Sequence, residues 1–260
     1  MASSIGTSHL SSGAPCQDSH CHHFVSGRDG SDVLILVAAD GAGTAARSNV
    51  GSWLACKTFA GLVDMFVTDG GNVADLNRTQ VESWITTIRH ELAERAAADE
   101  GQLRDYACTL LAVITAEDVT AFLQIGDGAI VVSNGEEDGW SYVFWPQHGE
   151  FANTTNFIIS PNATSVLEFE LAVRPILEVA IFTDGIENLV LHNANRAVHE
   201  PFFRAMFPAV RRSPVHGVDA DLSKGLDTYL STPSITDRTD DDKTLILATR
   251  MAPSPTKEMK

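Results

Sequence analysis

Four aspartates in tight turns beside apolar runs constrain this chain more than any other feature. They lie in Val33–Gly43 (VLILVAADGAG), Ala121–Gly128 (AFLQIGDG), Val179–Glu187 (VAIFTDGIE) and Thr239–Ala248 (TDDDKTLILA). An apolar run with β-branched residues predicts a buried strand, and a neighbouring glycine lets the backbone bend so that a carboxylate and a carbonyl face one point. The pattern therefore predicts strands that end in acidic turns.

Acids collected in this way need a counter-charge. Several carboxylates at one place repel one another and cannot all stay ionised. Mg²⁺ and Mn²⁺ prefer oxygen ligands, so bound divalent cations are the simplest explanation for the set.

The order of these motifs also resembles a family signature. DGAG at Asp40, GDG at Asp127, TDGIE at Asp184 and DDKT at Asp241 resemble, in this order, the metal-dependent (type 2C) serine/threonine protein phosphatases. Two further stretches, GTSH to GAPCQD (6–18) and GEFANTTNFI (149–158), fit the compact bacterial branch of that family. The resemblance runs from about Gly6 to Arg250.

The resemblance implies roles for individual residues. The Asp40 carboxylate would bridge two ions while the Gly41 carbonyl reaches one of them. Asp184 and Asp241 would be terminal ligands, and alignment to Asp240 or Asp242 instead of Asp241 stays an open alternative. The implied cofactor is two Mn²⁺ or Mg²⁺ ions, with a possible third.

Two further acids have ordinary explanations as well. The resemblance gives Asp127 a weaker additional metal site, but Asp-Gly is also favoured in a simple hairpin turn. It also gives Asp18 the task of holding metal-coordinated waters, although the preceding residue is Gln17 where well-studied members have Glu. A neutral amide can still bind a water by hydrogen bonding.

The implied activity is hydrolysis of phosphoserine and phosphothreonine in proteins by a hydroxide that bridges the two ions, without a side-chain nucleophile. The substrate would be a phosphoprotein made by a serine/threonine kinase.

Two family features are absent: Gly13 stands in place of a phosphate-binding Arg, and Ala42 in place of a His proposed as general acid. Arg47 is a candidate replacement anchor, and a solvated arginine at a helix start is its alternative. A weak or inactive phosphatase-like binding module, or a hydrolase of small phosphorylated metabolites, remains an alternative function.

Two other motifs point elsewhere and are disfavoured. Residues 41–46 (GAGTAA) match a dinucleotide fingerprint, but this requires a second strand ending in an acid about 20 residues on. Gly70–Gly71 and a second helical pattern follow instead. Cys16, His20, Cys21, His22 and His23 resemble a zinc cluster, but no second Cys/His pair has zinc-module spacing.

Composition narrows the class of protein. The length of 260 residues fits one domain, expected over 1–250, with a flexible tail at 251–260. A formal net charge of −16 argues against nucleic acid or an anionic membrane as the main partner. We see no apolar stretch of membrane-spanning length, no signal-peptide pattern and few cysteines, so we expect a cytoplasmic, reduced protein.

The pattern of elements predicts α+β architecture with antiparallel sheet. Helices are expected over Ser48–Thr68 and Thr79–Asp99. A meander of four strands is expected over 106–115, 120–125, 129–133 and 140–144, with later strands over 165–171, 176–182 and 244–250 and helical patches over 201–206 and 220–230. The family resemblance sharpens this to a β-sandwich flanked by helices on both faces, with the metals at one end.

Overall fold

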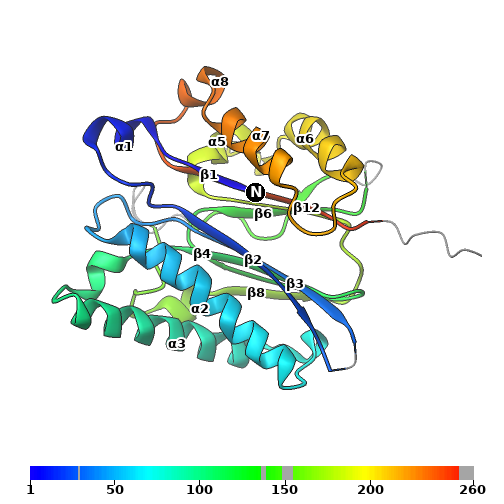
Figure 1. The fold of residues 1–260 in the computed structure, drawn as a ribbon, viewed down its shortest axis with the longest axis horizontal. Coiled ribbons are helices and arrows are strands. Elements are labelled where there is room, and N and C mark those ends of the chain that lie inside the picture. The colour runs from blue at the N-terminus through cyan, green and yellow to red at the C-terminus, as the bar shows by residue number, and fades with distance from the viewer. Residues whose placement is uncertain (29, 136–138, 148–154, 252–260) are drawn as a thin grey trace, which may run out of the picture.

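Two five-stranded antiparallel sheets face each other in the computed structural model, which describes residues 1–28, 30–135, 139–147 and 155–251 (Figure 1). The first sheet has the order β1 (Ala2–Ser4), β12 (Lys243–Thr249), β9 (Glu178–Phe182), β6 (Ala129–Ser133), β7 (Ser141–Tyr142). The second has the order β2 (Ser19–Ser26), β3 (Asp32–Ala39), β4 (Leu110–Thr115), β5 (Thr120–Ile125), β8 (Glu168–Ala172).

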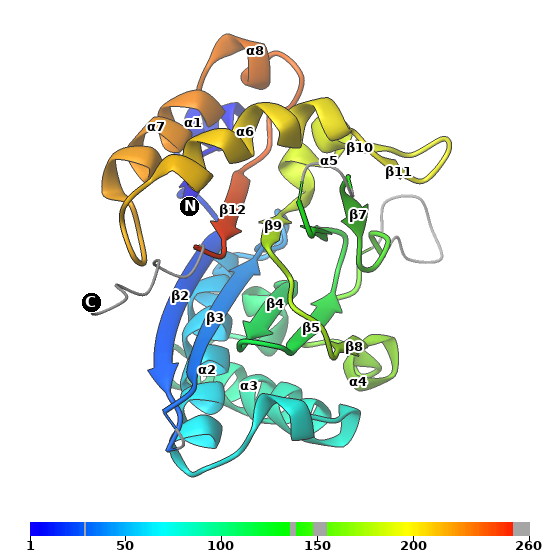
Figure 2. The same cartoon turned by 90° about the vertical axis from the view of Figure 1, so that its right-hand side faces the viewer.

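Helices cover the outer face of each sheet (Figure 2). The second sheet carries α2 (Ser48–Thr68) and α3 (Arg78–Ala98), and the first carries α6 (Glu200–Arg212) and α7 (Ala220–Leu230). The remaining elements are short: α1 (Thr7–Ser12), α4 (Ala163–Val166), α5 (Glu187–Val190), α8 (Pro233–Thr236), the strand pair β10 (Leu191–His192) and β11 (Ala197–Val198), and 3-10 turns at Val73–Asp75, Leu103–Tyr106 and Asp184–Ile186. The predicted α+β sandwich with helices on both faces is confirmed.

Alternation along β3 explains the layering. Val33, Ile35 and Val37 pack with the helices α2 and α3, while Leu36 and Ala38 pack against the facing sheet. Successive side chains of a strand point to opposite faces, so a continuous apolar run is what a strand covered on both faces requires. The other outer layer is formed by Phe203 and Phe207 of α6 against the first sheet.

The predicted meander is wrong after β5. β5 pairs with β4 and β8, whereas β6 lies in the other sheet beside β9 and β7. The turn at Gly126–Gly128 therefore crosses between sheets and does not close a hairpin. Gly126 has φ 119°, a conformation that glycine adopts without steric cost.

Other boundaries differ from expectation by small amounts. α2 matches its prediction and α3 begins one residue early, but the strand expected from 106 begins at Leu110, because 103–106 forms a 3-10 turn. The strand expected over 165–171 begins as α4 and becomes β8 only at Glu168. β1 and α1 were not predicted as separate elements, whereas β2 (Ser19–Ser26) contains His22 and His23, which were expected in or beside an early strand. The predicted tail from 252 onward lies outside the described residues.

α2 is long and apolar enough to cross a bilayer by length and composition alone, which our sequence analysis did not anticipate. Within the sandwich its buried residues, including Ala55, Phe59 and Val63, pack against the second sheet and α3. Core helices of soluble proteins meet the same criterion, so this is weak evidence for a membrane span.

Candidate metal centre

The register of the first sheet brings three of the aspartates together. Phe182 of β9 pairs with Leu245 of β12 on one side and with Ala129 of β6 on the other. Asp184 follows that rung, while Asp241 and Asp127 precede it on the neighbouring strands, so all three lie beyond the same edge. Asp40 follows β3 of the facing sheet.

The carboxylates converge closely. One oxygen from each of Asp40, Asp127 and Asp184 lies within 4.8 Å of the others. The charge of Asp241 is near enough to raise the pKa of both Asp40 and Asp184. The site residues expected from the strand-end motifs are thus gathered at one place.

Burial and mutual repulsion make this cluster reluctant to ionise. Burial raises the pKa of Asp40 well above its ordinary value, and the charges of Asp18 and Asp184 raise it further. Burial also raises the pKa of Asp184 to about 8, with repulsion from Asp127 and Asp241 adding to it. Divalent cations would remove this repulsion, so the donor set fits Mg²⁺ or Mn²⁺.

Asp18 comes to the cluster from the segment before β2. Burial raises its pKa to about 6, and a hydrogen bond from the Thr183 hydroxyl to Oδ2 at 2.7 Å opposes that rise. Its Oδ1 is buried without a donor in the described part of the chain, as is Oε1 of Gln17. Buried acceptors of this kind are normally satisfied, and a coordinated water or an ion would satisfy them.

The Asp40 turn is held by Thr109. The Thr109 hydroxyl accepts from the Asp40 N–H at 2.9 Å, and the Thr109 N–H donates to the Asp40 carbonyl at 2.8 Å. Gly41 is buried, and a Cβ there would lie 2.7 Å from the Gln17 carbonyl oxygen. Glycine is therefore required by the close approach of this turn to the segment before β2.

Adjacent acids at the start of β12 have opposite environments. Asp242 is buried, and its carboxylate accepts from the N–H groups of Gly6 and Gln17 at 2.6 and 2.5 Å. It also contacts Nδ1 of His9 at 2.9 Å. Asp241 is exposed, and its charge acts on Asp40 and Asp184. The hydrogen-bond partners of Asp242 favour a structural role for that acid, which leaves Asp241 as the candidate ligand.

Lys243 and Thr183 are site residues that our motif analysis did not single out. Lys243 is buried, and its ammonium donates to the Asp241 carbonyl at 2.9 Å and to the Ile5 carbonyl at 3.3 Å. The Thr183 hydroxyl accepts from the Thr244 N–H at 2.9 Å while donating to Asp18. Thr183 lies in the motif VAIFTDGIE and Lys243 in TDDDKTLILA, and only the aspartates of these motifs had been taken as candidate site residues.

Comparison with known proteins identifies the family. A model of the protein phosphatase 2C family matches residues 5–230. The chain belongs to this family. It is also 38% identical over 247 residues to Serine/threonine-protein phosphatase 3 of Escherichia coli (strain K12), covering 95% of this chain and 96% of that protein.

Solved structures agree in fold. Serine/threonine phosphatase Stp1 from Staphylococcus aureus superposes with a TM-score of 0.55 at 14% identity, covering 92% of this chain and 90% of that one. The S. agalactiae serine/threonine phosphatase gives 0.54 at 17% identity, covering 94% and 96%. At these identities the comparison supports the phosphatase fold alone.

Arg47, the candidate phosphate anchor, has other partners. Its guanidinium donates to the Tyr106 hydroxyl at 2.9 Å and to the Asp99 carbonyl at 3.0 Å, and pairs with the Asp99 carboxylate at 3.2 Å. None of these partners is a site aspartate. The anchoring role stays a prediction, and the contacts favour a role in holding α2 against the end of α3.

Gly13 and Ala42, which replace the Arg and the His of the family, have only backbone roles in the structure. Gly13 ends α1 in the left-handed conformation, with φ 73° and open space around its Cβ position. The Ala42 N–H donates to the Ala107 carbonyl at 2.9 Å. Neither position brings a cation to this phosphatase-family site.

The Cys/His stretch does not form a zinc cluster in the described residues. Its members lie on and before β2, where His20 Nδ1 contacts the Ser3 hydroxyl at 2.7 Å. Besides the site aspartates, closely spaced potential ligands within the described ranges occur at His90, Glu91 and Glu94 on the exposed face of α3. This group includes no member of the Cys/His stretch, so a zinc site in that stretch stays disfavoured.

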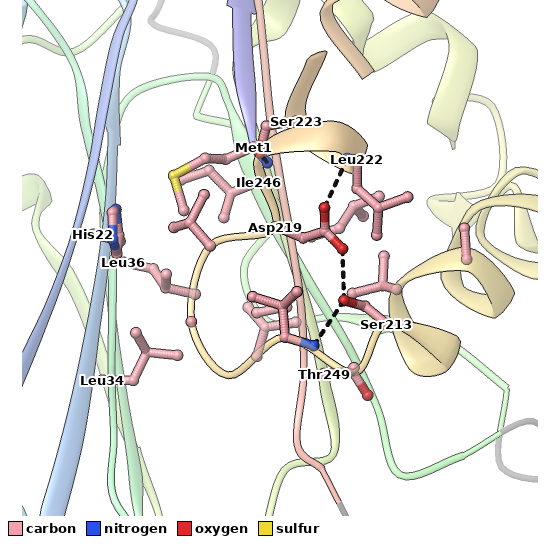
Figure 3. Close-up of a pocket in the computed structure, with 18 of the residues that line it drawn as sticks. Met1, His22, Leu34, Leu36, Ser213, Asp219, Leu222, Ser223, Ile246 and Thr249 are labelled. Atoms are coloured by element: carbon pink, nitrogen blue, oxygen red, sulfur yellow. Dashed lines mark hydrogen bonds between the residues drawn. The ribbon is translucent and has the colours of Figure 1, made fainter. Parts of the chain in front are cut away.

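A large cavity lies apart from the aspartates. It has a volume of about 570 Å³ and lies between β2 and β3 on one side and the region of α6 and α7 on the other. Figure 3 shows Leu34 and Leu36 across from the segment that carries Ser213 and Asp219. None of the site aspartates lines it, so the cavity is separate from the metal centre.

Proposed function

We propose that this chain hydrolyses phosphoserine and phosphothreonine in proteins, with two Mn²⁺ or Mg²⁺ ions held by Asp40, Asp184 and Asp241 and a further ion near Asp127. The observation that carries the proposal is the convergence of three buried or half-buried carboxylate oxygens within 4.8 Å. Membership of the protein phosphatase 2C family and the close relation to a serine/threonine-protein phosphatase support the substrate class.

Bound cations would lower the pKa of a water and neutralise charge on the phosphoryl oxygens. The chain supplies the frame for that chemistry. Thr109 fixes the backbone at Asp40, and Thr183 orients Asp18, whose second oxygen is placed to hold a water. Gly41 keeps this turn against the segment of Asp18.

Two thiols that are affected by the charges of the site aspartates, Cys16 and Cys108, do not favour a covalent phosphoenzyme. Burial raises the pKa of the Cys16 thiol to about 12, and nearby Asp18 and Asp242 raise it as well. Burial also raises the pKa of the Cys108 thiol, with the charge of Asp40 adding to the effect. A protonated thiol is a poor nucleophile, so direct attack by water is the mechanism that these residues support.

The decisive test is hydrolysis of p-nitrophenyl phosphate and of a phosphoserine peptide with Mn²⁺, with Mg²⁺ and with EDTA. Asp184→Asn should abolish metal-dependent turnover, and Asp69→Asn is the matched control because that side chain is 81% exposed. Turnover in EDTA, or an unaffected Asp184→Asn enzyme, would contradict the proposal. Faster turnover of nucleotides than of phosphopeptides would favour a small-metabolite hydrolase.

A further inference from the structure

The short helix α1 is docked on the loop that carries Asp241. The N–H of Ser8 donates to the Asp240 carbonyl at 3.0 Å, and the Ser8 hydroxyl donates to the same oxygen at 2.7 Å. The N–H of Gly6 donates to Oδ1 of Asp242. Two segments more than 230 residues apart in sequence are thereby fixed beside the metal centre.

His9 on this helix forms a pair with a buried carboxylate. Its Nδ1 lies 2.9 Å from Oδ2 of Asp242, whose side chain is 1% exposed against 14% for His9. With Asp242 ionised, Nδ1 carries a hydrogen and donates it. A carboxylate at one ring nitrogen fixes the orientation and tautomer of the imidazole.

The pair of His9 and Asp242 is connected to two segments that carry site aspartates. Asp242 directly follows Asp241, and the Asp242 oxygen that contacts His9 also accepts from the N–H of Gln17, which precedes Asp18. In the described part of the chain, Nε2 of His9 has no hydrogen-bond partner, and the ring keeps part of its surface in solvent. The Asp242 carboxylate thus holds the His9 ring beside the two segments that carry Asp241 and Asp18.

Phosphate release from serine or threonine needs a proton at the leaving oxygen, because an alkoxide is a poor leaving group. Two cations that lie close in sequence to the site aspartates are already engaged. Lys243 donates to two backbone carbonyls, and Arg47 is held by Asp99 and Tyr106. His9 has a ring nitrogen available for the task.

We propose that His9 is the general acid, donating a proton from Nε2 to the departing seryl or threonyl oxygen, with Asp242 orienting the ring. This rests on the proposed function. The bond between phosphorus and the side-chain oxygen breaks, its electron pair stays on that oxygen, and the oxygen takes the proton from Nε2. A water oxygen forms the new bond to phosphorus, and that water gives up a proton to solvent. His9 is left neutral, with Nδ1–H still donating to Asp242, and regains its proton from solvent.

The test compares kcat for a phosphoserine peptide with kcat for p-nitrophenyl phosphate, whose leaving group is a stable anion, at saturating Mn²⁺. His9→Asn keeps an N–H near the position of Nδ1 and loses the titratable nitrogen. It should lower the peptide-to-nitrophenyl ratio by about 10²-fold, the usual size of a general-acid contribution. His90→Asn, at an exposed histidine of α3, is the matched control and should leave the ratio unchanged.

The ratio does not depend on how much of each preparation is folded, since both substrates are measured on the same sample. A wild-type ratio in His9→Asn would overturn the proposal. So would recovery of the peptide rate in His9→Gln, which restores a hydrogen-bond donor near Nε2 but no proton transfer. If the wild-type enzyme hydrolyses neither substrate, the proposed function itself fails, and the role of His9 fails with it.

Discussion

Replacing Asp184 by Asn should stabilise the metal-free protein while it destroys the metal centre. The carboxyl pKa of Asp184 is about 8 in the folded chain and about 3.8 in the unfolded chain. A carboxyl whose pKa is raised on folding binds its proton more tightly in the native state. Its contribution to stability is complete below the unfolded pKa and is lost as the pH rises toward 8.

The size of the effect follows from this shift. At 1.36 kcal/mol per pKa unit, Asp184 destabilises the metal-free fold by about 2 kcal/mol at pH 5.5 and about 5 kcal/mol at pH 7.5. Asparagine cannot ionise, so the stability difference between Asp184→Asn and wild type should grow by about 2 to 3 kcal/mol over that interval. The depressed pKa of His20, about 4 because of burial, affects both proteins alike and cancels.

Urea unfolding in EDTA, followed by fluorescence of the buried Trp84 and Trp140, measures this difference at each pH. A difference that stays flat with pH, or a variant less stable than wild type at pH 7.5, would refute the electrostatic reasoning. Mn²⁺ at 100 times its dissociation constant should add about 2.7 kcal/mol to wild type. The variant should gain much less, because it lacks a ligand.

Three further predictions concern packing and assignment. Gly185→Ala should destabilise the fold by more than ~2 kcal/mol, because its Cβ would lie 1.9 Å from the Asp242 carbonyl oxygen. Gly225→Ala, in open space on α7, is its control and should gain up to ~1 kcal/mol by helix propensity; equal melting temperatures for the two variants would contradict this. Arg47→Ala should leave KM for a phosphopeptide within about twofold, because its contacts are structural; a tenfold rise would restore the anchoring role. Asp242→Ala should cost at least ~2 kcal/mol of stability, because it leaves buried N–H donors unpaired, whereas Asp241→Asn should weaken Mn²⁺ binding with little loss of stability. The opposite pattern, measured by calorimetric Mn²⁺ titration and urea unfolding, would exchange the two assignments.

Local pattern was enough to predict the long elements. The period of Trp84, Ile88 and Leu92 predicted α3, and the apolar run before Asp40 predicted β3, because both encode burial directly. The turn at Asp127 was misjudged as a hairpin. Asp-Gly favours a tight turn in either case, and which sheet receives the following strand depends on β9, more than 40 residues later.

The acids of the candidate site could be predicted from the sequence, but the hydrogen-bond partners around them could not. The strand-end motifs pointed to Asp40, Asp184 and the acidic run at 240–242, and the family resemblance selected Asp241 within that run. Nothing local distinguished Asp241 from Asp242, since the difference lies in donors from Gly6, His9 and Gln17 near the other end of the chain. The partners of Arg47 were equally hidden, because Asp99 is more than 50 residues away.

The environment of Asp242 ties the metal centre to the whole fold. Its carboxylate joins the segment before β2 to the start of β12, so the acids of these two segments acquire their positions only when the chain ends pack together. In the metal-free state Asp40 and Asp184 oppose that packing through repulsion, while Asp242 favours it through three hydrogen-bonding contacts. Ions bound by Asp40 and Asp184 would remove this repulsion, so metal affinity and folding stability would both depend on the electrostatics of the same carboxylates.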